Sequence, residues 1–529
     1  MTTDSENINR TRMLLATSSG VLLTASFPKV GLDWLAWFAL VPLLVSIRTL
    51  SVKDSFLLGL TTGFVHYLTL VYWLVYTMKD YGNLPFPVAV SILMLMAAYL
   101  ALYIAVFACS VSLWEPGPFG SLISIPLTWV SIEYLRSFLL SGFPWEFLGH
   151  SQFNRLHIIQ ISDIFGVYGV SFLLALSNTA ILLCYLFVKE KRWRGFSVTR
   201  GPAALSLLIF FGTFLACWSY SGWRIRNVDH AISASPAVRI GIVQGNIDQS
   251  RKWDPAFQDS TTEKYLDLSL SAVKDRPELL VWPETATPFY YLSDTRLTGR
   301  IQKGIQSAGA DFLVGSPSFV RRADKIDYFN SAYVILSDGS VSAKYDKAQL
   351  VPFGEYVPLK KWLPFLGKMV ENVGDFKTGE KGNTVSWRGY RLGIQICFEI
   401  IFPGLSRAMV QNQAALLVNI TNDAWFGKTA APYQHFSMAV FRAIENRRTL
   451  VRSANTGISG FVDPVGRIIA STPLFEEAVT TRPVPVLTAA TVYTRYGDAF
   501  AQGCLLALLA AAIWKITMAF NAAKARRGR

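Results

Sequence analysis

The chain has 529 residues, of which 51% are hydrophobic, 13% aromatic and only 16% charged. A typical soluble protein carries about 25% charged residues, so this composition argues against a purely soluble protein and also against disorder. The formal net charge is +14, from 50 Lys and Arg against 36 Asp and Glu. Nine of the basic residues lie in two short segments, 189–200 and 524–529, that fit membrane topology signals. We therefore do not expect nucleic-acid binding.

Eight stretches are apolar and long enough for a helix of about 20 residues, the length that crosses the hydrocarbon core of a bilayer. The expected spans are 12–28, 31–47, 55–78, 88–113, 119–136, 168–187, 203–222 and 498–520. This pattern predicts a polytopic α-helical membrane bundle with a large insert. We predict a membrane domain over 1–222, an inserted domain over 223–497 with its core at 236–485, and a last span with a basic tail over 498–529.

The distribution of Lys and Arg predicts the orientation of the bundle. These residues favour the cytoplasmic ends of spans, and the loop 189–200 and the C-terminal tail are both rich in them. Both termini are therefore expected in the cytoplasm. The inserted domain, which follows seven spans, is expected on the outer face of the membrane.

From about residue 236 the pattern changes to short runs rich in Val, Ile and Leu, separated by helical stretches. Continuous apolar strands that alternate with helices are typical of sheets covered by helices. We therefore predict an α/β layered domain. Its expected strand regions are 238–246, 278–284, 312–319, 328–339, 391–399, 415–423 and 457–469, the last of which resembles a hairpin.

Three reactive residues follow or lie near these runs: Glu284, Lys347 and Cys397, which is the one cysteine of the inserted domain. The active sites of α/β folds lie in the crevice at strand ends. A thiol beside a lysine and near a helix N-terminus is expected to have a stabilised thiolate.

A cysteine nucleophile needs a base, and histidine is the usual partner. His435 and, at the domain boundary, His230 are the histidines available. Glu284 is an alternative base if a partly apolar site raises its pKa, and Lys347 is suited to stabilise an oxyanion. From the residues alone, Cys397 also fits a buried cysteine without a reaction. Glu284 and Lys347 likewise fit ordinary surface charges.

The motifs around these residues are more specific. Glu284 in VWPET, Lys347 in YDKAQLVPFGEYVP and Cys397 in GIQICFE resemble the Glu-Lys-Cys triad of the nitrilase, or carbon-nitrogen hydrolase, superfamily. The seven preceding spans and the segments VQGNIDQSRKWD, NDAWFG and GFPWEFLGHSQ make nearly the whole chain similar to the apolipoprotein N-acyltransferase family.

That resemblance implies an αββα sandwich for the inserted domain and an acyl transfer in two half-reactions. The sn-1 acyl chain of a phospholipid would pass to a cysteine thioester and then to the α-amine of the diacylglyceryl-cysteine of an apolipoprotein. The resemblance also implies a bacterial inner-membrane protein whose inserted domain lies in the periplasm.

The resemblance further implies roles for single residues. Glu284 would be the general base, Lys347 the oxyanion stabiliser and Cys397 the nucleophile. Glu355 and Glu399 match supporting positions of the active site. Trp253 and Phe398 match positions near the substrate, although many relatives have Tyr where this chain has Phe398. The missing hydroxyl affects a substrate contact and leaves the triad intact.

Two further segments are expected to contact lipid. Residues 359–370, LKKWLPFLGKMV, combine three lysines with Trp362 and other apolar side chains, a pattern that favours the membrane interface. Its alternative is a core helix with a basic edge. Trp145 in GFPWEF either belongs to an interfacial aromatic belt or lines the path of the lipid.

Two other classes of protein remain open at this stage. A membrane-tethered amidase or nitrilase would pass the same thioester to water. A transporter would need ionisable residues inside its spans, and His66 and Glu133 are the main candidates. We expect no metal and no cofactor, because no Cys/His set has ligand spacing and no Gly-rich phosphate loop precedes a helix. We expect a monomer.

Overall fold

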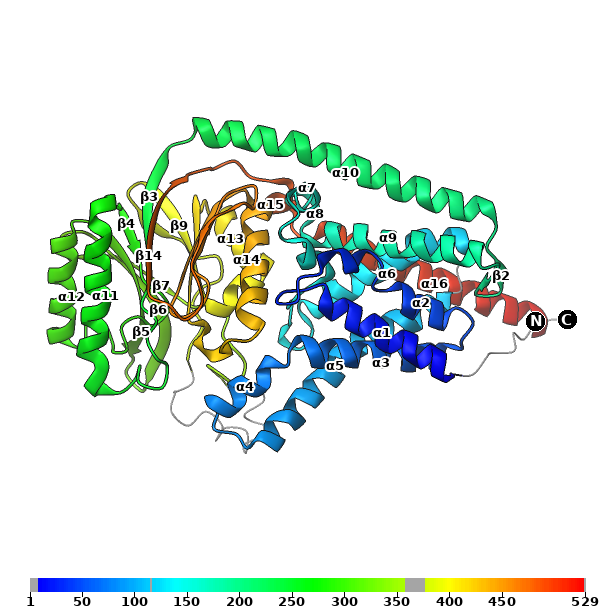
Figure 1. The fold of residues 1–529 in the computed structure, drawn as a ribbon, viewed down its shortest axis with the longest axis horizontal. Helices are drawn as coiled ribbons and strands as arrows, with labels where there is room; N and C mark the ends of the chain where they lie inside the picture. Colours follow the sequence, from blue (N-terminus) through cyan, green and yellow to red (C-terminus); the bar gives the residue numbers. More distant parts are fainter. Residues whose placement is uncertain (1–7, 115–116, 357–375, 528–529) are drawn as a thin grey trace. The chain divides into compact units, whose positions relative to one another are not determined.

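The computed structural model describes residues 8–114, 117–356 and 376–527. The chain forms two compact units, coloured along the sequence in Figure 1. The first, called here the helical unit, contains Met1–Tyr72, Val90–Gly222 and Tyr496–Arg529. The second, called the α/β unit, contains Trp73–Ala89 and Trp223–Arg495.

The helical unit consists of long helices joined by short ones. Its main helices are α1 (Arg10–Ala25), α2 (Val41–Ile47), α3 (Val52–Leu70), α5 (Phe86–Trp114), α6 (Pro118–Arg136), α9 (Val167–Val188), α10 (Arg200–Ala234) and α16 (Ala499–Arg527), of which α5 and α10 continue across the unit boundary. The short elements are η1 (Asp33–Trp37), η2 (Leu139–Ser141), η3 (Leu148–Gln152), α7 (Leu156–Ile159), α8 (Ser162–Phe165) and the hairpin β1 (Arg192–Trp193) and β2 (Phe196–Ser197).

Within the described residues, four helices are long and apolar enough to cross a membrane: α5, α9, α10 and the part Ala499–Met518 of α16. A fifth is added if the bent pair α3 and α4 (Trp73–Asp80) forms one span. The count of eight predicted from the sequence is therefore not confirmed.

Local sequence explains two of the differences. The expected span 31–47 is divided into η1 and α2 at Phe38, whose φ is −143°; Gly31, with a positive φ of 72°, precedes η1, and Pro42 lies at the start of α2. The expected span 12–28 is the 16-residue helix α1. Its Arg12 is buried and donates from Nη1 to the carbonyl of Ser46, at 2.6 Å.

The α/β unit contains two six-stranded sheets. The first has the order β14-β3-β4-β5-β6-β7, with β3 (Ala237–Gln244), β4 (Leu279–Val281), β5 (Asp311–Arg321), β6 (Ile326–Ile335), β7 (Val341–Asp346) and β14 (Ala478–Pro485). The second has the order β13-β12-β11-β10-β9-β8, with β8 (Val385–Trp387), β9 (Tyr390–Ile396), β10 (Leu416–Thr421), β11 (Thr449–Ala454), β12 (Gly460–Val462) and β13 (Ile468–Ser471).

The central strands of each sheet are parallel, and the outer strands are antiparallel. β3, β4 and β5 run parallel with Ile242 paired to Val281 and Val281 to Leu313, and β9, β10 and β11 run parallel in the other sheet. Parallel strands buried on both faces are expected to be nearly continuous in Val, Ile and Leu, as the sequence of β10 shows. The carboxyl ends of β4 and β9 hold Glu284 and Cys397.

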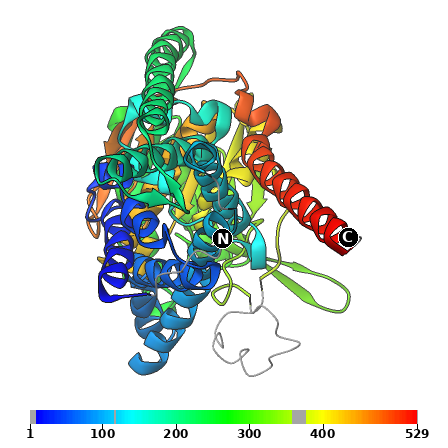
Figure 2. The same cartoon turned by 90° about the vertical axis from the view of Figure 1, so that its right-hand side faces the viewer.

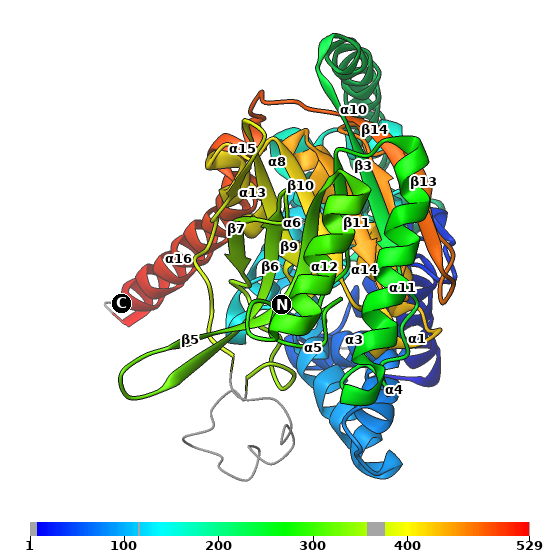
Figure 3. The ribbon, with the colours of Figure 1, turned by 90° about the vertical axis from the view of Figure 1, so that its left-hand side faces the viewer.

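The two sheets face each other, and helices cover their outer faces (Figures 1 and 3). The hydroxyl of Ser453 on β11 donates across the interface to the carbonyl of Val281 on β4, at 2.9 Å. Helices α11 (Gln258–Ala272) and α12 (Thr295–Ala308) cover the first sheet, and α13 (Pro403–Gln411) and α14 (Ala431–Asn446) cover the second. The unit is thus a four-layered helix–sheet–sheet–helix sandwich.

One short helix from the N-terminal half of the chain belongs to the α/β unit. Figure 2 shows the long helices of the chain from a second direction. Helix α4 packs on η8 (Asp423–Phe426), where the rings of Trp73 and Phe426 lie 4.9 Å apart and Thr77 Oγ1 donates to the carbonyl of Trp425. The motif NDAWFG is therefore packed against a helix that follows directly on α3.

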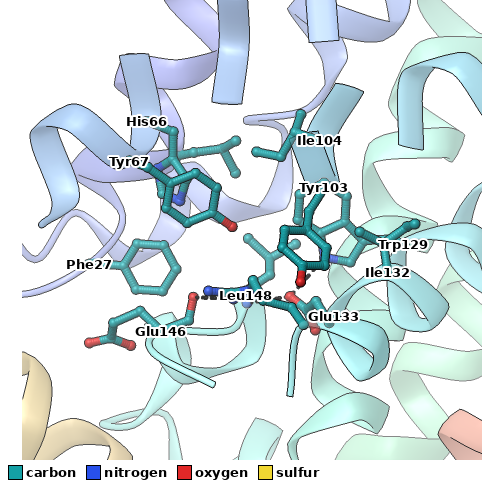
Figure 4. A pocket seen from close by; sticks show the side chains of 12 residues that line it. Phe27, His66, Tyr67, Tyr103, Ile104, Trp129, Ile132, Glu133, Glu146 and Leu148 are labelled. Carbon is teal, nitrogen blue, oxygen red and sulfur yellow. Dashed lines mark hydrogen bonds between the residues drawn. The ribbon is translucent and has the colours of Figure 1, made fainter. Parts of the chain in front are cut away.

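The two ionisable residues expected inside spans line one small pocket of the helical unit (Figure 4). Glu133 Oε1 accepts from Trp129 Nε1 and from the backbone N–H of Leu148, and His66 Nδ1 lies 2.9 Å from Thr24 Oγ1. The cavity has a volume of about 20 Å³, enough for roughly one water molecule. Both residues are thus held by hydrogen bonds within the unit.

Candidate active site

Glu284 lies at the carboxyl end of β4 and is 6% exposed. Its Oε1 accepts from Asn330 Nδ2 at 2.8 Å, and its Oε2 accepts from the backbone N–H of Asn422 at 3.0 Å. The loop reaches this position because β5 carries Gly315, where a Cβ would lie 2.4 Å from the carbonyl oxygen of Pro283. The alternative of an ordinary surface carboxylate does not hold, because this one is buried and doubly hydrogen-bonded.

Lys347 follows β7 and is 1% exposed, so it is not a surface charge either. Its Nζ donates to Glu355 Oε1 at 2.8 Å and lies 3.6 Å from Glu284 Oε1. Asn330 Nδ2 also donates to Glu355 Oε1, at 2.9 Å, so one amide joins the two glutamates. The two carboxylates raise the pKa of Lys347 above its ordinary value against the lowering effect of burial, and the lysine is an ammonium at neutral pH.

Cys397 directly follows β9 and is the first residue of η7 (Cys397–Ile401). It is buried and adopts a φ of 55°, a left-handed conformation that a non-glycine residue rarely takes. Strained residues of this kind cluster at active sites, where the surrounding structure holds them. Helix α13 begins six residues later with Pro403, as the sequence predicts.

The electrostatics of the thiol differ from the expectation. Burial and the negative charge of Glu284 raise the pKa of Cys397 above its ordinary value, and the opposing effect of Lys347 is smaller. The expected stabilisation of the thiolate by the lysine is present, but it is smaller than these two effects, so the resting group is a thiol. A neutral thiol beside a buried carboxylate needs that carboxylate to take its proton at the moment of attack, which is general-base chemistry.

Glu399 supports the backbone of the site through hydrogen bonds. The carboxylate is completely buried. Its Oε1 accepts from the backbone N–H groups of Ala348 and Gln349, at 2.6 and 2.9 Å, and its Oε2 accepts from that of Ile396, at 2.7 Å. Burial raises its pKa to about 7 against these hydrogen bonds. Glu399 thus ties the segment after Lys347 to the strand that carries Cys397.

A buried ionic cluster lies on the other side of the nucleophile. Asp423 Oδ2 accepts from Arg452 Nη2 at 2.8 Å, and Asp423 Oδ1 lies 3.0 Å from His435 Nδ1. Arg452 also donates to Asn419 Oδ1, and Asn419 Nδ2 donates to the carbonyls of Gln395 and Cys397. This cluster holds the backbone on both sides of the nucleophile in place.

His435 is therefore committed to this cluster. Burial, followed by Arg452, lowers its pKa, while Asp423 and the backbone of Cys397 raise it less. Its contacts include Asp423, Arg452, Phe426 and the backbone of Cys397. This arrangement favours Glu284 over His435 as the base.

The remaining predicted contacts occupy different environments. Trp253 is 49% exposed, and Phe398 is partly buried with its ring 5.2 Å from that of Phe402. Trp145 is fully buried in the helical unit, stacked at 5.9 Å on Phe143. It is therefore not an exposed aromatic of a membrane belt. Trp362 and the segment 359–370 lie outside the described residues.

Sequence reasoning did not single out several residues of this site. They are Asn330, which joins the glutamates, Asn422, whose N–H binds Glu284, the pair Asp423 and Arg452, and Lys252, whose Nζ donates to the backbone carbonyl of Glu284. The motifs NDAWFG and RKWD marked three of them without indicating a role. Across the described ranges, no group of His, Cys, Asp and Glu is arranged to hold a metal ion.

Two family models match the chain. The model of the apolipoprotein N-acyltransferase N-terminal domain matches residues 19–180, and that of the carbon-nitrogen hydrolases matches residues 239–493. The first matches most of the N-terminal part of the helical unit, without α10 and α16, and the second matches nearly all of the sandwich.

Full-length relatives are similar to the chain as well. The apolipoprotein N-acyltransferase of Geobacter metallireducens is 44% identical over 506 residues, covering 95% of each chain. That of Methylococcus capsulatus is 32% identical over 496 residues, covering 92% of each chain. Among solved structures, an amidase of the nitrilase superfamily from Nesterenkonia is 20% identical, with a TM-score of 0.37 over 50% of this chain and 95% of the amidase.

Proposed function

This chain belongs to the apolipoprotein N-acyltransferase family, and we propose that its α/β unit transfers an acyl group from a phospholipid to the N-terminus of an apolipoprotein. The acyl donor is the sn-1 chain of a phospholipid. The acceptor is the α-amino group of an N-terminal S-diacylglyceryl-cysteine. The observation that carries the proposal is the buried cluster of Glu284, Lys347 and Glu355 that acts on the thiol of Cys397.

The first half-reaction forms a thioester on Cys397. Glu284 takes the thiol proton as the sulfur attacks the ester carbonyl, and the ammonium of Lys347 stabilises the oxyanion that forms. When the tetrahedral intermediate collapses, the bond to the glycerol oxygen breaks. Glu284 returns its proton to that oxygen, and a lysophospholipid leaves.

The second half-reaction uses the same groups. The free amine attacks the thioester carbonyl, and Lys347 again stabilises the oxyanion. Glu284 takes a proton from the attacking nitrogen and returns one to the departing sulfur, which gives the amide and the free thiol. Glu355 and Asn330 hold Lys347 and Glu284 at fixed separations during both steps, which lowers the cost of orienting them.

The same proposal covers the membrane arrangement. The apolar helices and the family fit a bacterial membrane protein, in which we place the α/β unit in the periplasm and both termini in the cytoplasm, because of the Lys and Arg bias. We retain eight spans, a membrane domain over 1–222 and 498–529, and a monomeric enzyme as parts of this proposal. Trp253, Phe398 and Trp362 are the proposed lipid contacts, whereas Trp145 is a fully buried residue of the helical unit.

Hydrolysis by a tethered amidase is the weaker alternative. The full-length relatives carry the acyltransferase name over more than nine-tenths of this chain, and an N-terminal domain of that family precedes the hydrolase-like domain. An amidase needs no such domain.

Substitution of the five cysteines tests the proposed nucleophile. Cys397→Ala is expected to abolish acyl transfer and the mass increase of the protein by one acyl chain after exposure to phospholipid. Alanine at Cys109, Cys184, Cys217 or Cys504 provides matched controls that retain both. A Cys397→Ala protein that is still acylated would overturn the assignment.

A further inference from the structure

Lys252 is a buried lysine in an exposed segment. Residues 251–257 follow β3 and include η4 (Pro255–Phe257). In this run Lys252 is 1% exposed, whereas all the other residues are exposed. Burying an ammonium is costly unless the site compensates its charge. The inward position of this one side chain therefore requires a partner in the interior.

That partner is the site around the nucleophile. Lys252 Nζ donates to the backbone carbonyl of Glu284 at 3.1 Å, and the charges of Glu284 and Cys397 both act on its pKa. An ammonium has three N–H groups. In the described part of the chain, the Glu284 carbonyl is the one acceptor bonded to Nζ, and no carboxylate lies within 4.0 Å of it.

Lys347, by contrast, is already neutralised by carboxylates. Its Nζ lies 2.8 Å from Glu355 and 3.6 Å from Glu284. The positive charge of Lys252, which no carboxylate within 4.0 Å neutralises among the described residues, therefore adds to that of Lys347 in balancing a negative charge on the sulfur. With both lysines charged, the set of Glu284, Glu355, Lys347, Lys252 and the neutral thiol has no net charge, and transfer of the thiol proton to Glu284 keeps it so.

We propose that Lys252 is a second cationic positioning residue of this site, which fixes the main chain of Glu284 and stabilises the thiolate of Cys397. The inference rests on the proposed function, because it needs Cys397 as the nucleophile. The lysine of the motif RKWD thereby takes part in the chemistry, and its neighbour in the motif is the exposed Trp253.

The stabilisation of the Cys397 thiolate by Lys252 is expected to weaken as the pH rises. Burial lowers the pKa of Lys252 to about 8, while Glu284 and Cys397 raise it less. The other titratable groups that face this cluster are Lys347, Glu355, Glu399 and Asp423. Below pH 8 the ammonium is present and favours the thiolate, and above pH 8 its effect is lost.

Alkylation of Cys397 by iodoacetamide tests the proposal without any lipid substrate. The rate constant is measured on the full-length protein in detergent between pH 6 and 10, by mass spectrometry of the peptide that contains Cys397. Lys252→Gln keeps an N–H donor for the Glu284 carbonyl and removes the charge. Lys252→Arg keeps the charge at all these pH values, and Lys303→Met is a control at an exposed lysine.

At pH 7 we expect alkylation of Lys252→Gln to be about tenfold slower than that of the natural protein, as a shift of one pKa unit gives. The difference should disappear above pH 8, whereas the Lys252→Arg and Lys303→Met proteins should stay within about twofold of the natural rate at pH 7. In Lys252→Arg, the rate should keep rising above pH 8 where that of the natural protein levels off.

Equal rates for Lys252→Gln and the natural protein at every pH would overturn the proposal. A difference that stays constant from pH 6 to 10 would overturn it too, because a purely structural role predicts that result. If Lys252→Gln does not fold, equal pH profiles of Lys252→Arg and the natural protein overturn the proposal. A natural Cys397 that is not alkylated at any of these pH values would instead contradict the proposed function.

Discussion

Nζ of Lys347 lies 3.6 Å from Oε1 of Glu284, outside hydrogen-bond distance, although the two side chains are buried together. The hydrogen bond of Lys347 goes to Glu355 instead, and Asn330 donates to Glu284. A carboxylate has about four lone-pair sites, of which the hydrogen bonds from Asn330 Nδ2 and the backbone N–H of Asn422 occupy two in Glu284. Glu284 is therefore close to a positive charge and still able to accept a proton.

Loss of the base is the first test of this arrangement. Glu284→Gln is expected to lower the rate of lysophospholipid release by 10²–10⁴-fold, roughly the contribution of a general base. The rate with saturating phospholipid and thermal unfolding of the same preparation are the measurements. Glu477→Gln, at an exposed surface ion pair, is the matched control and should keep its rate. A folded Glu284→Gln protein with normal turnover would exclude this base.

Removal of the Lys347 ammonium is expected to raise the free energy of the transition state. Lys347→Ala should reduce kcat by about 10²–10³-fold, since one oxyanion-stabilising donor contributes about 3–4 kcal/mol. Its KM for phospholipid should change little, because the ammonium interacts with charge that develops only during the reaction. Steady-state kinetics separate the two constants. A Lys347→Ala protein with a raised KM and an unchanged kcat would point to substrate binding instead.

The buried ionic cluster of Asp423, Arg452 and His435 is expected to contribute a free energy of unfolding that depends on pH. Arg452 and His435 lower the pKa of Asp423 to about 2 against the effect of burial. A carboxyl with a depressed pKa in the folded state stabilises the fold above its unfolded pKa of about 3.9, and this stability is lost as the pH falls toward 2.

Asp423→Asn tests this contribution. It leaves Arg452 buried without its counter-charge, so we expect a loss of about 3–5 kcal/mol at pH 7. The difference from the natural protein should shrink between pH 4 and pH 2. Thermal unfolding monitored by circular dichroism measures both effects, and Asp267→Asn, at an exposed site, serves as control. Equal melting temperatures at pH 7 would show that the cluster does not stabilise the fold.

The orientation of the chain has its own test. Reporter fusions at residue 195 and at residue 300 should report the cytoplasm and the periplasm, respectively, because of the basic loop 189–200. A cytoplasmic signal at both positions would contradict the proposed topology.

Short motifs made the elements of the sandwich and the main site residues predictable. The apolar runs before Glu284 and Cys397 are strands β4 and β9, and both residues lie at strand ends. The direction in which the pKa of Cys397 is shifted was not predictable from the sequence. It is set by burial and by the charge of Glu284, and both come from residues that are distant in sequence. Asn330 is one such residue, since it joins Glu284 and Glu355 from the middle of β6.

The membrane spans were less predictable than the sandwich. Hydropathy over a window counts apolar residues, whereas the helices of the structure also depend on single interruptions such as Gly31 and Pro42. Lys252 escaped prediction for a related reason. Its neighbours in RKWD are exposed, and sequence alone does not reveal that one side chain turns inward.

The most direct test of acyl transfer is a single-turnover measurement without acceptor. Purified protein and phospholipid should release about one equivalent of lysophospholipid and then stop, because ping-pong chemistry leaves a thioester that waits for its second substrate. A diacylglyceryl-cysteine peptide with a free amine should discharge the thioester and become N-acylated, and the N-acetylated peptide should not. Continuous release of free fatty acid without acceptor, at a rate that the peptide does not change, would contradict acyl transfer and indicate a hydrolase.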